Sequence, residues 1–242
     1  GRPFHRTIPS PTHICVTGGV LREKLGTVCT DCYAHNPNSK YAFNPAQQKL
    51  MRNLDAITTN DAVEWATQFA DVVPKETANY PVFRFHDSGE WLSPEHISMY
   101  VDIAKKNPKT LFWIPTREWE MLKKVFDARG YDIPKNFVPR VSLPYVNQTL
   151  DNEENERRGV PLLDEKLVDL LEEFKPERQK QDPNRPIIDY STVIDRPEYK
   201  SSKSSLLCPS SNPVTQSGKC LDNQCMACHL PKVRTIDYFK HK

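Results

Sequence analysis

Residues 81–115 read PVFRFHDSGEWLSPEHISMYVDIAKKNPKTLFWIP and predict a strand, a helix and a second strand in that order. The two strands are PVFRF (81–85) and LFWIP (111–115), short apolar runs rich in aromatic residues. Between them, Ser93 suits the N-cap of the helix and Pro94 its first residue, where no backbone N–H is needed. A strand–helix–strand unit of this kind is typical of a parallel sheet.

The same alternation continues on both sides of this unit. It predicts an α/β fold, a complete or partial TIM-like parallel β/α barrel, whose chemistry lies at the carboxyl ends of the strands. We expect one domain over 1–242, with 200–242 as a cysteine-rich closure segment. Further strands are expected at 13–16, 137–144 and 186–194, and further helices over 45–57, 60–72, 117–129 and 161–175. The 60–72 helix has Asn60 as its N-cap and an apolar face of Val63, Ala66, Phe69 and Ala70, and the 117–129 helix is ended by Gly130. Residues 151–159 are expected to form a solvated charged loop.

Composition narrows the function classes. A chain of 242 residues buries a full core without disulfide staples. It contains no apolar run of the roughly 20 residues needed to span a membrane, and no signal peptide, so we expect a cytoplasmic protein with no membrane partner. The net charge is only +2 and charges of both signs are interspersed, so nucleic acid is not an expected partner.

All seven cysteines lie in two groups near the ends of the chain. The N-terminal cysteines are Cys15, Cys29 and Cys32, and the C-terminal cysteines are Cys208, Cys220, Cys225 and Cys228. Each group contains a C-x-x-C pair, a spacing that suits metal or cluster ligation as well as disulfides. The odd count and the expected reducing compartment favour metal over disulfide.

The metal itself stays open between iron–sulfur and zinc. Three thiolates suit a 4Fe-4S cluster with one iron left open, whereas His13 or His35 would complete a zinc site with the N-terminal cysteines. Four thiolates at the C-terminus fit a second 4Fe-4S cluster, a structural zinc, or one metal shared between both groups. Seven thiolates are too many for one cluster, so two sites are the simpler interpretation.

The turn after the 81–85 strand indicates what the N-terminal cysteines bind. Ser88, Gly89 and Glu90 follow that strand directly and precede a helix, which resembles the Gly-Gly-Glu segment of radical S-adenosylmethionine (radical SAM) enzymes. In that family three cysteines after the first strand hold a cluster, and the Gly-Gly-Glu segment receives the methionine amine of the cofactor. The resemblance implies that Ser88, Gly89 and Glu90 bind S-adenosylmethionine, with Glu90 meeting its amine as a catalytic candidate. Arg117 follows the next strand and is a further cofactor-binding candidate that would bind a carboxylate or phosphate, with a surface salt bridge as the alternative. His86 stands at the end of the 81–85 strand and is a second catalytic candidate, with a buried core histidine as the alternative.

This chain departs from the radical SAM pattern in two places. Cys15 lies 14 positions before Cys29, where the usual pattern is CxxxCxxC, and Ser88 replaces the first glycine. Gly89 keeps the freedom to adopt positive φ. The short motifs also resemble those of phage-encoded proteins of unassigned function: C-x-x-C-Y-A (Cys29–Ala34), H-x-S-G-D/E (His86–Glu90) and a terminal C-x-x-C (Cys225–Cys228).

Two functions from different classes therefore remain. The first is a radical-SAM-like iron–sulfur protein that reductively cleaves S-adenosylmethionine and acts on an unknown small-molecule or macromolecular substrate, with an electron donor as partner. The second is a non-catalytic electron-transfer protein or a zinc-stabilised binding module. A phage origin would place either one in the host cytoplasm. Among the tryptophans, Trp91 and Trp119 follow strand ends and are expected to line a pocket, while Trp65 and Trp113 are expected in the core.

Overall fold

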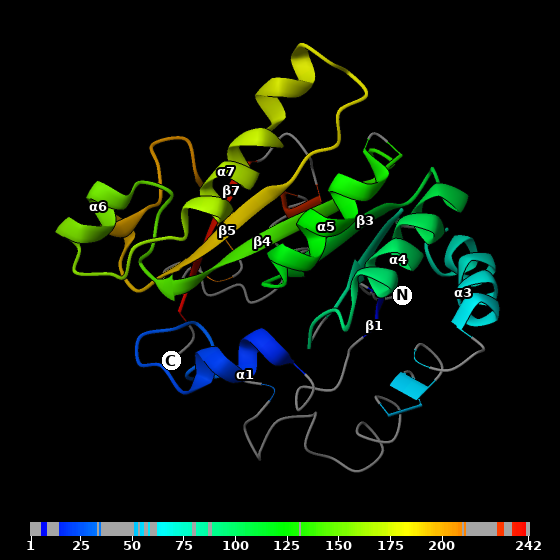
Figure 1. The fold of residues 1–242 in the computed structure, drawn as a ribbon, viewed down its shortest axis with the longest axis horizontal. Helices are drawn as coiled ribbons and strands as arrows, with labels where there is room; N and C mark the ends of the chain where they lie inside the picture. The colour runs from blue at the N-terminus through cyan, green and yellow to red at the C-terminus, as the bar shows by residue number, and fades with distance from the viewer. Residues whose placement is uncertain are drawn as a thin grey trace.

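Seven parallel strands form the framework of the protein (Figure 1). They follow the order β1-β2-β3-β4-β5-β7-β6 across one sheet. The computed structural model describes residues 6–8, 15–32, 34, 51–52, 54–55, 58, 62–78, 81–86, 89–130, 132–209, 211, 227–229 and 234–240. The strands are β1 (Arg6–Ile8), β2 (Val82–Phe85), β3 (Leu111–Thr116), β4 (Phe137–Val146), β5 (Asp189–Ile194), β6 (Leu206–Leu207) and β7 (Thr235–Phe239).

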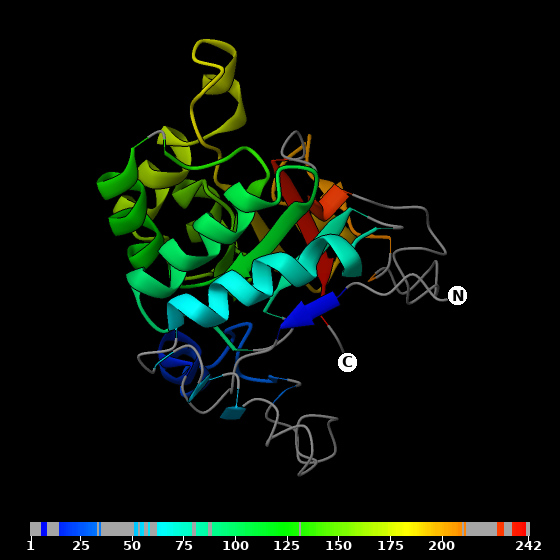
Figure 2. The ribbon, with the colours of Figure 1, turned by 90° about the vertical axis from the view of Figure 1, so that its right-hand side faces the viewer.

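Helices connect the strands and cover one face of the sheet. They are α1 (Val16–Arg22), α3 (Ala62–Glu76), α4 (Pro94–Lys106), α5 (Trp119–Arg129), α6 (Asn152–Arg157) and α7 (Glu165–Glu173), with 3-10 turns η3 (Pro176–Lys180), η4 (Pro197–Tyr199) and η5 (Ala227–His229). Figures 1 and 2 show α3, α4, α5 and α7 along the same face, while α1 lies below the carboxyl ends of the strands. None of the described helices is long and apolar enough to cross a membrane.

The order of the strands makes the sheet singly wound. From β1 to β5 each new strand is added beside the previous one, always parallel, so the direction of winding does not reverse. This sequence of steps builds a half-barrel with helices outside and a concave face inside. The predicted α/β class and parallel sheet are confirmed. Among the described strands β1 pairs only with β2 and β6 only with β7, so the described part of the sheet does not close into a barrel.

The two faces of the sheet carry different residues because side chains alternate along a strand. On the outer face Phe83, Phe85, Phe112 and Ile114 belong to the main hydrophobic core, together with buried residues of α4, α5 and α7. The in-register pairs Arg84–Trp113, Arg140–Asp189 and Ser142–Ser191 lie on the opposite, inner face. The inner face is therefore polar, unlike the packed aliphatic interior of a filled barrel.

The central βαβ unit forms as its residues predict. β2 and β3 cover the two expected strands, and α4 begins at Pro94 with the backbone N–H of His96 donating to Ser93 Oγ at 3.3 Å. α5 ends before Gly130, whose φ of 53° is a conformation that glycine adopts without strain. The strands expected at 137–144 and 186–194 and the helix expected over 161–175 also form, with boundaries shifted by a few residues.

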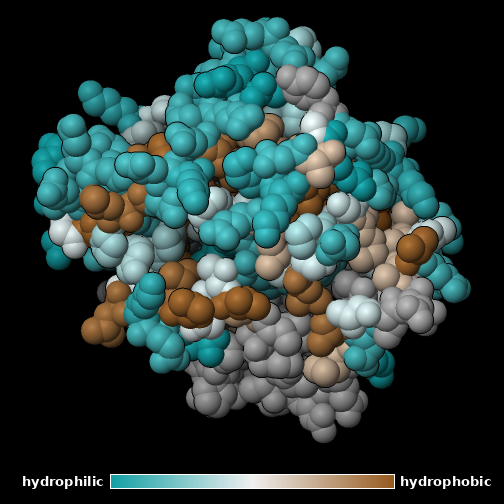
Figure 3. All heavy atoms as spheres, viewed as in Figure 1, coloured by the Kyte–Doolittle hydropathy of each residue, from teal (hydrophilic) through white to brown (hydrophobic). Residues whose placement is uncertain are grey.

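The strand expected at 13–16 is wrong at its two described residues, Cys15 and Val16, and a strand lies earlier in the chain. Residues 13 and 14 lie outside the described part of the chain. β1 spans Arg6–Ile8, and Cys15 is the N-cap of α1, which begins at Val16. The glycine pair Gly18–Gly19, which follows the expected strand, lies inside this helix. The N-terminal cysteines thus occupy the connection after β1, and α1 exposes Val16 and Val20 to solvent. Hydrophobic residues are scattered among hydrophilic ones on the face of the molecule that Figure 3 shows.

Two smaller expectations also fail. Of the apolar face expected for α3, Ala66, Phe69 and Ala70 pack against the main core as expected, together with Val73, but Val63 is 77% exposed. Trp91 is 1% exposed and belongs to the main core rather than to the lining of a pocket. The expected N-cap Asn60 and most of the expected 45–57 helix lie outside the described residues.

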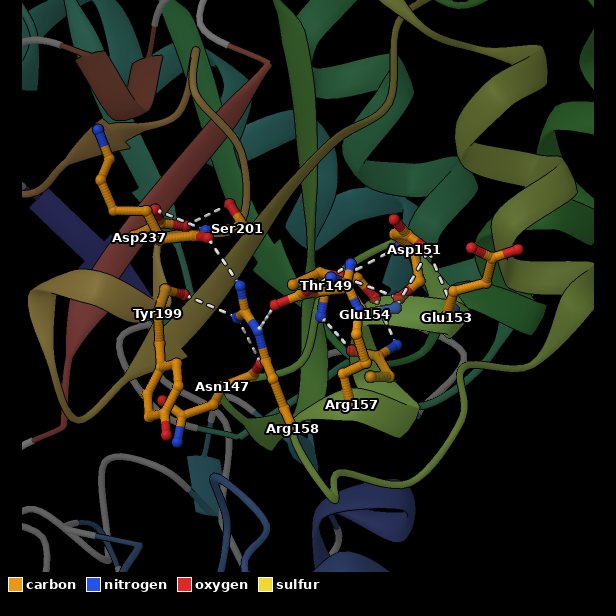
Figure 4. A network of polar contacts seen from close by, with 12 residues as sticks. Asn147, Thr149, Asp151, Glu153, Glu154, Arg157, Arg158, Tyr199, Ser201 and Asp237 are labelled. Carbon is orange, nitrogen blue, oxygen red and sulfur yellow. Dashed lines mark hydrogen bonds and ion pairs between the residues drawn. The ribbon is translucent and has the colours of Figure 1, made fainter.

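The charged run 151–159 forms a helix and a polar network instead of a solvated loop (Figure 4). Asp151 caps α6 by accepting from the backbone N–H groups of Glu153 and Glu154. Arg158 donates to the carbonyl oxygens of Asn147 and Tyr199 at 3.0 and 2.9 Å. The charges are therefore used to attach α6 to the connection that follows β5.

Strand β7, which no sequence pattern predicts, lies inside the sheet between β5 and β6. Its Asp237 is fully buried and accepts hydrogen bonds from Thr192, Ser201 and Ser205. The backbone N–H of Cys208 also donates to the Asp237 carbonyl at 2.8 Å. Strand β7 is thus attached to the sheet, and the hydrogen bond from its N–H holds Cys208 beside this strand.

Candidate functional site

A cavity of about 650 Å³ opens on the inner face of the half-barrel, at the carboxyl ends of the strands. All three N-terminal cysteines line it, together with Gly89, Glu90, His86 and Arg117. The fold therefore brings together most of the residues that the sequence singles out. Ser88 and Asp87 lie outside the described residues. Gly89 has a φ of 73°, as expected for the turn.

Helix α1 positions Cys15 at the cavity. Cys15 caps this helix, and its carbonyl accepts from the N–H of Gly19 at 2.8 Å. The start of α1 is fixed to the loop after β3, because Thr17 donates to both carboxylate oxygens of Glu118, through its N–H at 3.1 Å and its hydroxyl at 2.8 Å. The first cysteine is thereby tied to the end of β3, about a hundred residues away in the chain.

Gly18 allows two of the cysteine sulfurs to approach the same point. A Cβ atom placed on Gly18 would lie 2.5 Å from Cys15 Sγ and 3.7 Å from Cys29 Sγ. The first distance is shorter than a real Cβ contact, so a side chain here would displace Cys15. Gly19, one residue further along the same helix, has no atom within 4 Å of such a Cβ.

The remaining two cysteines are held by a turn that packs on the end of β4. Thr27 forms an antiparallel bridge with Tyr145, and the N–H of Val28 donates to the carbonyl of Pro144 at 3.0 Å. The Thr27 hydroxyl accepts from the N–H of Cys29, and the N–H of Cys32 donates to the carbonyl of Cys29. The C-x-x-C pair is therefore a rigid turn. No disulfide joins the three N-terminal cysteines.

The charged residues around Cys15 and Cys29 have opposite effects on the pKa values of these thiols. Burial raises the pKa of Cys15 to about 12, further raised by Glu90, and burial also raises the pKa of Cys29. Arg117 acts in the opposite direction on both thiols. Burial lowers the pKa of Arg117, but Cys29, Glu90 and the other two cysteines outweigh it and the net shift is upward. Arg117 is thus the cation that would compensate negative charge on the three sulfurs.

Glu90 is a buried acid at the edge of the same cavity. It is 4% exposed, and its carboxylate accepts from the Thr116 hydroxyl at 2.8 Å and from the N–H of Arg117 at 3.1 Å. The Arg117 guanidinium lies 3.6 Å from the same carboxylate. Burial nevertheless raises the pKa of Glu90 to about 7, against the effects of Arg117 and Thr116.

This raised pKa predicts a stability that falls as pH rises. Between its ordinary value of 4.5 and about 7, the folded protein keeps a proton on Glu90 that the unfolded chain has lost. Relative to Glu90→Gln, the wild-type free energy of unfolding should fall by roughly 2–3 kcal/mol from about pH 4.5 to about pH 8. Urea unfolding of both metal-free proteins across this range measures the difference.

The control for this experiment is Glu120→Gln, which makes the same change at an exposed position of α5. Its free energy of unfolding should differ from that of the wild type by an amount that stays constant over the same pH range. A constant difference for Glu90→Gln would instead mean that folding does not shift the pKa of Glu90.

His86 lines the cavity but packs mainly into an aromatic group. Its ring lies 5.6–5.9 Å, centre to centre, from those of Trp91, His96 and Tyr100, and it is 2% exposed. Burial lowers its pKa well below the usual value, with contributions from His96 and Arg84. His86 is therefore neutral at physiological pH. Its φ of 55° marks a strained backbone at the end of β2.

The two C-terminal cysteines that the structure describes, Cys208 and Cys228, cluster with a residue that lines the same cavity. Cys208 and Cys228 are buried in a small cluster with Trp113, Ala227 and Ile236. Cys228 Sγ lies 2.9 Å from the Tyr238 hydroxyl oxygen. Trp113 and Tyr238 also line the cavity, so Cys208 and Cys228 lie beside residues that border it. Cys220 and Cys225 lie outside the described residues.

The described side chains do not form a ready-made site for a single metal ion. No group of three or more His, Cys, Asp or Glu residues in the described part of the chain is arranged to hold one. The N-terminal sulfurs share a cavity rather than one coordination sphere. Of the seven cysteines predicted as ligands, the three N-terminal ones line this cavity, and Cys208 and Cys228 lie beside residues that line it.

Several residues of the cavity were missed by sequence reasoning. These are Arg22, Arg84, Ser142, Ser191, Tyr238 and Lys240. One signal was available for Arg84, because the strict alternation in Phe83-Arg84-Phe85 places a charge on the face opposite two core aromatics. Nothing comparable marks Tyr238, since β7 itself was not expected.

The residues that converge on this cavity extend from Cys15 near one end of the chain to Lys240 near the other. The family model described as Gene product 88 matches residues 9–231 and so includes all seven cysteines. The chain belongs to the Gene product 88 family. The predicted relationship to phage-encoded proteins of unassigned function is thereby confirmed. No curated protein and no solved structure is significantly similar to the chain.

Proposed function

We propose that this member of the Gene product 88 family is an iron–sulfur protein that resembles radical SAM enzymes, with Cys15, Cys29 and Cys32 holding a 4Fe-4S cluster. One observation carries the proposal: the three thiols lie on a single connection after β1 and line one cavity at the carboxyl ends of parallel strands. Beside them are a buried acid, Glu90, and a cation, Arg117.

The residues present fit such a cluster in chemistry and in space. Thiolates are soft ligands that select iron–sulfur clusters and zinc over harder cations. A cubane is larger than a single ion, so its thiolates stand further apart than the ligands of one tetrahedral zinc. A cavity of about 650 Å³ is also within the roughly 300–1,000 Å³ typical of small-molecule sites, which leaves room for S-adenosylmethionine.

Each nearby residue has a role that follows from its contacts. When bound, the cluster supplies single electrons to a ligand at its open iron. Arg117 compensates the negative charge that three thiolates bring into a partly buried site. Thr116 and the N–H of Arg117 orient the Glu90 carboxylate, which would face the amine of S-adenosylmethionine. The Thr17–Glu118 contact keeps Cys15 in position.

The arrangement of the fold also supports the resemblance. The half-barrel is singly wound, the cysteine connection follows β1, and the Gly89–Glu90 turn follows β2. Its concave face would exclude water from a reactive group. We assign the C-terminal cysteines to a second cluster that relays electrons, with zinc as the alternative metal, and an electron donor as the partner of the protein.

Metal and sulfide analysis of anaerobically purified protein tests the proposal directly. We expect brown protein with about eight irons per chain for two cubanes, or about four for one. Cys29→Ser should lower the iron content by about four per chain, because it removes a ligand of the N-terminal cluster. The matched control is Leu25→Ser in the same loop, which is 90% exposed and should leave the iron content unchanged.

The outcome separates the two function classes. Colourless protein that contains only zinc would contradict the cluster and would support a zinc-stabilised binding module instead. If iron is present, incubation with dithionite and S-adenosylmethionine should release methionine. Iron-loaded protein that neither cleaves S-adenosylmethionine nor changes its absorption spectrum when the compound is added would instead be a non-catalytic electron carrier.

A further inference from the structure

Strand β7 holds the turn that begins at Cys208 along three consecutive residues, Asp237–Phe239. The N–H of Cys208 donates to the Asp237 carbonyl at 2.8 Å, and the N–H of Phe239 donates to Ser211 Oγ at 3.0 Å. The N–H and the hydroxyl of Ser211 donate in turn to the Cys208 carbonyl, at 3.3 and 3.2 Å. The turn is thus attached to β7 at the residue before Tyr238 and at the residue after it.

The side chain of Tyr238 contacts the second described C-terminal cysteine. Residues two apart on a strand share a face, and Ile236 belongs to the buried cluster of Cys208, Cys228, Trp113 and Ala227, against which Tyr238 also packs. The Tyr238 hydroxyl oxygen lies 2.9 Å from Cys228 Sγ. The same short piece of β7 therefore supports Cys208 through the backbone and Cys228 through a side chain.

Metal binding would fix the direction of the hydrogen bond between Tyr238 and Cys228. Without a metal, either the thiol or the hydroxyl can donate. A cysteine that ligates a metal has lost its proton and can only accept, whereas a tyrosine hydroxyl has one to give. Hydrogen bonds of this kind hold a ligand in its binding orientation and commonly contribute roughly 10–100-fold to the affinity for the metal.

The position of Tyr238 also relates the C-terminal cysteines to the cavity of the candidate site. Tyr238 lines that cavity, which the three N-terminal cysteines line as well. Its side chain therefore meets the cavity and the Cys228 sulfur at the same time. A metal bound to Cys228 would be separated from the cavity by no more than this one side chain.

We propose that Tyr238 is a positioning residue that donates a hydrogen bond to the metal-bound sulfur of Cys228 and thereby strengthens metal binding by the C-terminal cysteines. This inference rests on the proposed function only for the assignment of a metal to these cysteines. Two buried thiols in one cluster fit that assignment, because thiolates are ligands of both zinc and iron–sulfur clusters. Neither the identity of the metal nor the N-terminal cluster enters the inference.

Cobalt and zinc binding to the full-length chain tests the inference. The chain carries Cys29→Ser, which takes one thiolate from the N-terminal cysteines and leaves the four C-terminal ones as the larger thiolate set. Metal-free protein is titrated anaerobically with Co²⁺, whose absorption reports sulfur-to-cobalt charge transfer, and Zn²⁺ is then added in competition. Adding Tyr238→Phe should weaken zinc binding at least tenfold, because the ring remains and only the hydroxyl is lost.

The position of the cobalt bands distinguishes a hydrogen bond from packing. A donated hydrogen bond stabilises the electrons of the sulfur, so its loss should move the charge-transfer bands of the Tyr238→Phe protein to longer wavelength. Weaker binding with unmoved bands would mean that Tyr238 has only a structural role, and this overturns the inference. Unchanged affinity together with unchanged bands overturns it as well, as does a Cys29→Ser parent that binds no cobalt.

The matched control is Tyr199→Phe, which removes a tyrosine hydroxyl from η4. Its ring stacks on the Arg158 guanidinium at 5.3 Å, a contact that phenylalanine retains. This variant should bind zinc as tightly as the parent and show the same cobalt bands. An equal loss of affinity in Tyr199→Phe and Tyr238→Phe would contradict a specific contact with Cys228.

Iron analysis of the wild type distinguishes this inference from the proposed function. Wild-type protein without iron, whose zinc affinity and cobalt bands nevertheless depend on Tyr238, would overturn the N-terminal cluster and retain the role of Tyr238. Iron-loaded wild type combined with cobalt bands that are insensitive to Tyr238→Phe would do the reverse.

Discussion

Gly18→Ala is expected to remove the metal from the N-terminal cysteines while leaving the protein folded. The new Cβ would lie 2.5 Å from Cys15 Sγ, so the thiol must rotate away from its position in the cavity. The iron assigned to this site should fall at least tenfold, because three thiolates are the minimum that the proposed cluster uses. Iron and sulfide analysis of the anaerobic variant measures the loss.

The fold should tolerate this change because Gly18 lies within helix α1. Alanine is favoured over glycine inside a helix by about 1 kcal/mol, which offsets part of the displacement of Cys15. Gly19→Ala is the matched control, since its Cβ would meet no atom within 4 Å. It should retain all of the iron and gain roughly 0.5–1 kcal/mol of stability. Equal iron content in the two variants would contradict the close approach of Cys15 to Gly18.

Arg140→Met is expected to destabilise the protein by about 3–5 kcal/mol, the largest single effect on stability that we predict. Arg140 and Asp189 are both fully buried on the inner face, with Arg140 Nη2 3.1 Å from the carboxylate of Asp189. Burial raises the pKa of Asp189 and Arg140 opposes that effect. Removing Arg140 therefore leaves a buried acid without its cation, and urea unfolding measures the cost.

A second substitution distinguishes a lost pair from lost packing. Arg140→Met combined with Asp189→Leu should recover most of the stability, because neither charge is then buried alone. Recovery will be incomplete, since Arg140 also donates to the carbonyl oxygens of Tyr190 and Arg234. Lys123→Met breaks an exposed ion pair with Asp127 and should cost less than 1 kcal/mol. A cost of Arg140→Met no larger than this would contradict a buried pair.

The strands and helices of the central unit could be predicted because their signals are local. Ser93, Pro94 and Gly130 mark helix ends through their own hydrogen bonding or backbone freedom, which neighbouring residues alone decide. Strand β7 has no such local pattern, because its sequence TIDYF is short and lies in the cysteine-rich segment 200–242. Its place between β5 and β6 is decided by pairing with strands far away in the chain.

The candidate site could be predicted in part. The two cysteine groups and the Gly89–Glu90 turn are visible in the sequence, because C-x-x-C and a glycine before an acid after a strand are short patterns. Helix α1, which begins directly after Cys15, is not predicted from the sequence, because a seven-residue helix containing two glycines has little helical propensity of its own. It is held by the Thr17–Glu118 contact instead.

By itself, the sequence determined that this is an α/β protein with thiolate-rich ends and a polar turn after its second strand, because residue type and spacing are sufficient for those features. Only the tertiary structure decided which of these residues meet. Singly wound strands bring the loops after β1, β2 and β3 to one edge of the sheet, so Cys15, Glu90 and Arg117 line one cavity. Sheet curvature and the insertion of β7 then place Arg84, Trp113 and Tyr238 around the same space, a consequence of long-range pairing that no local pattern contains.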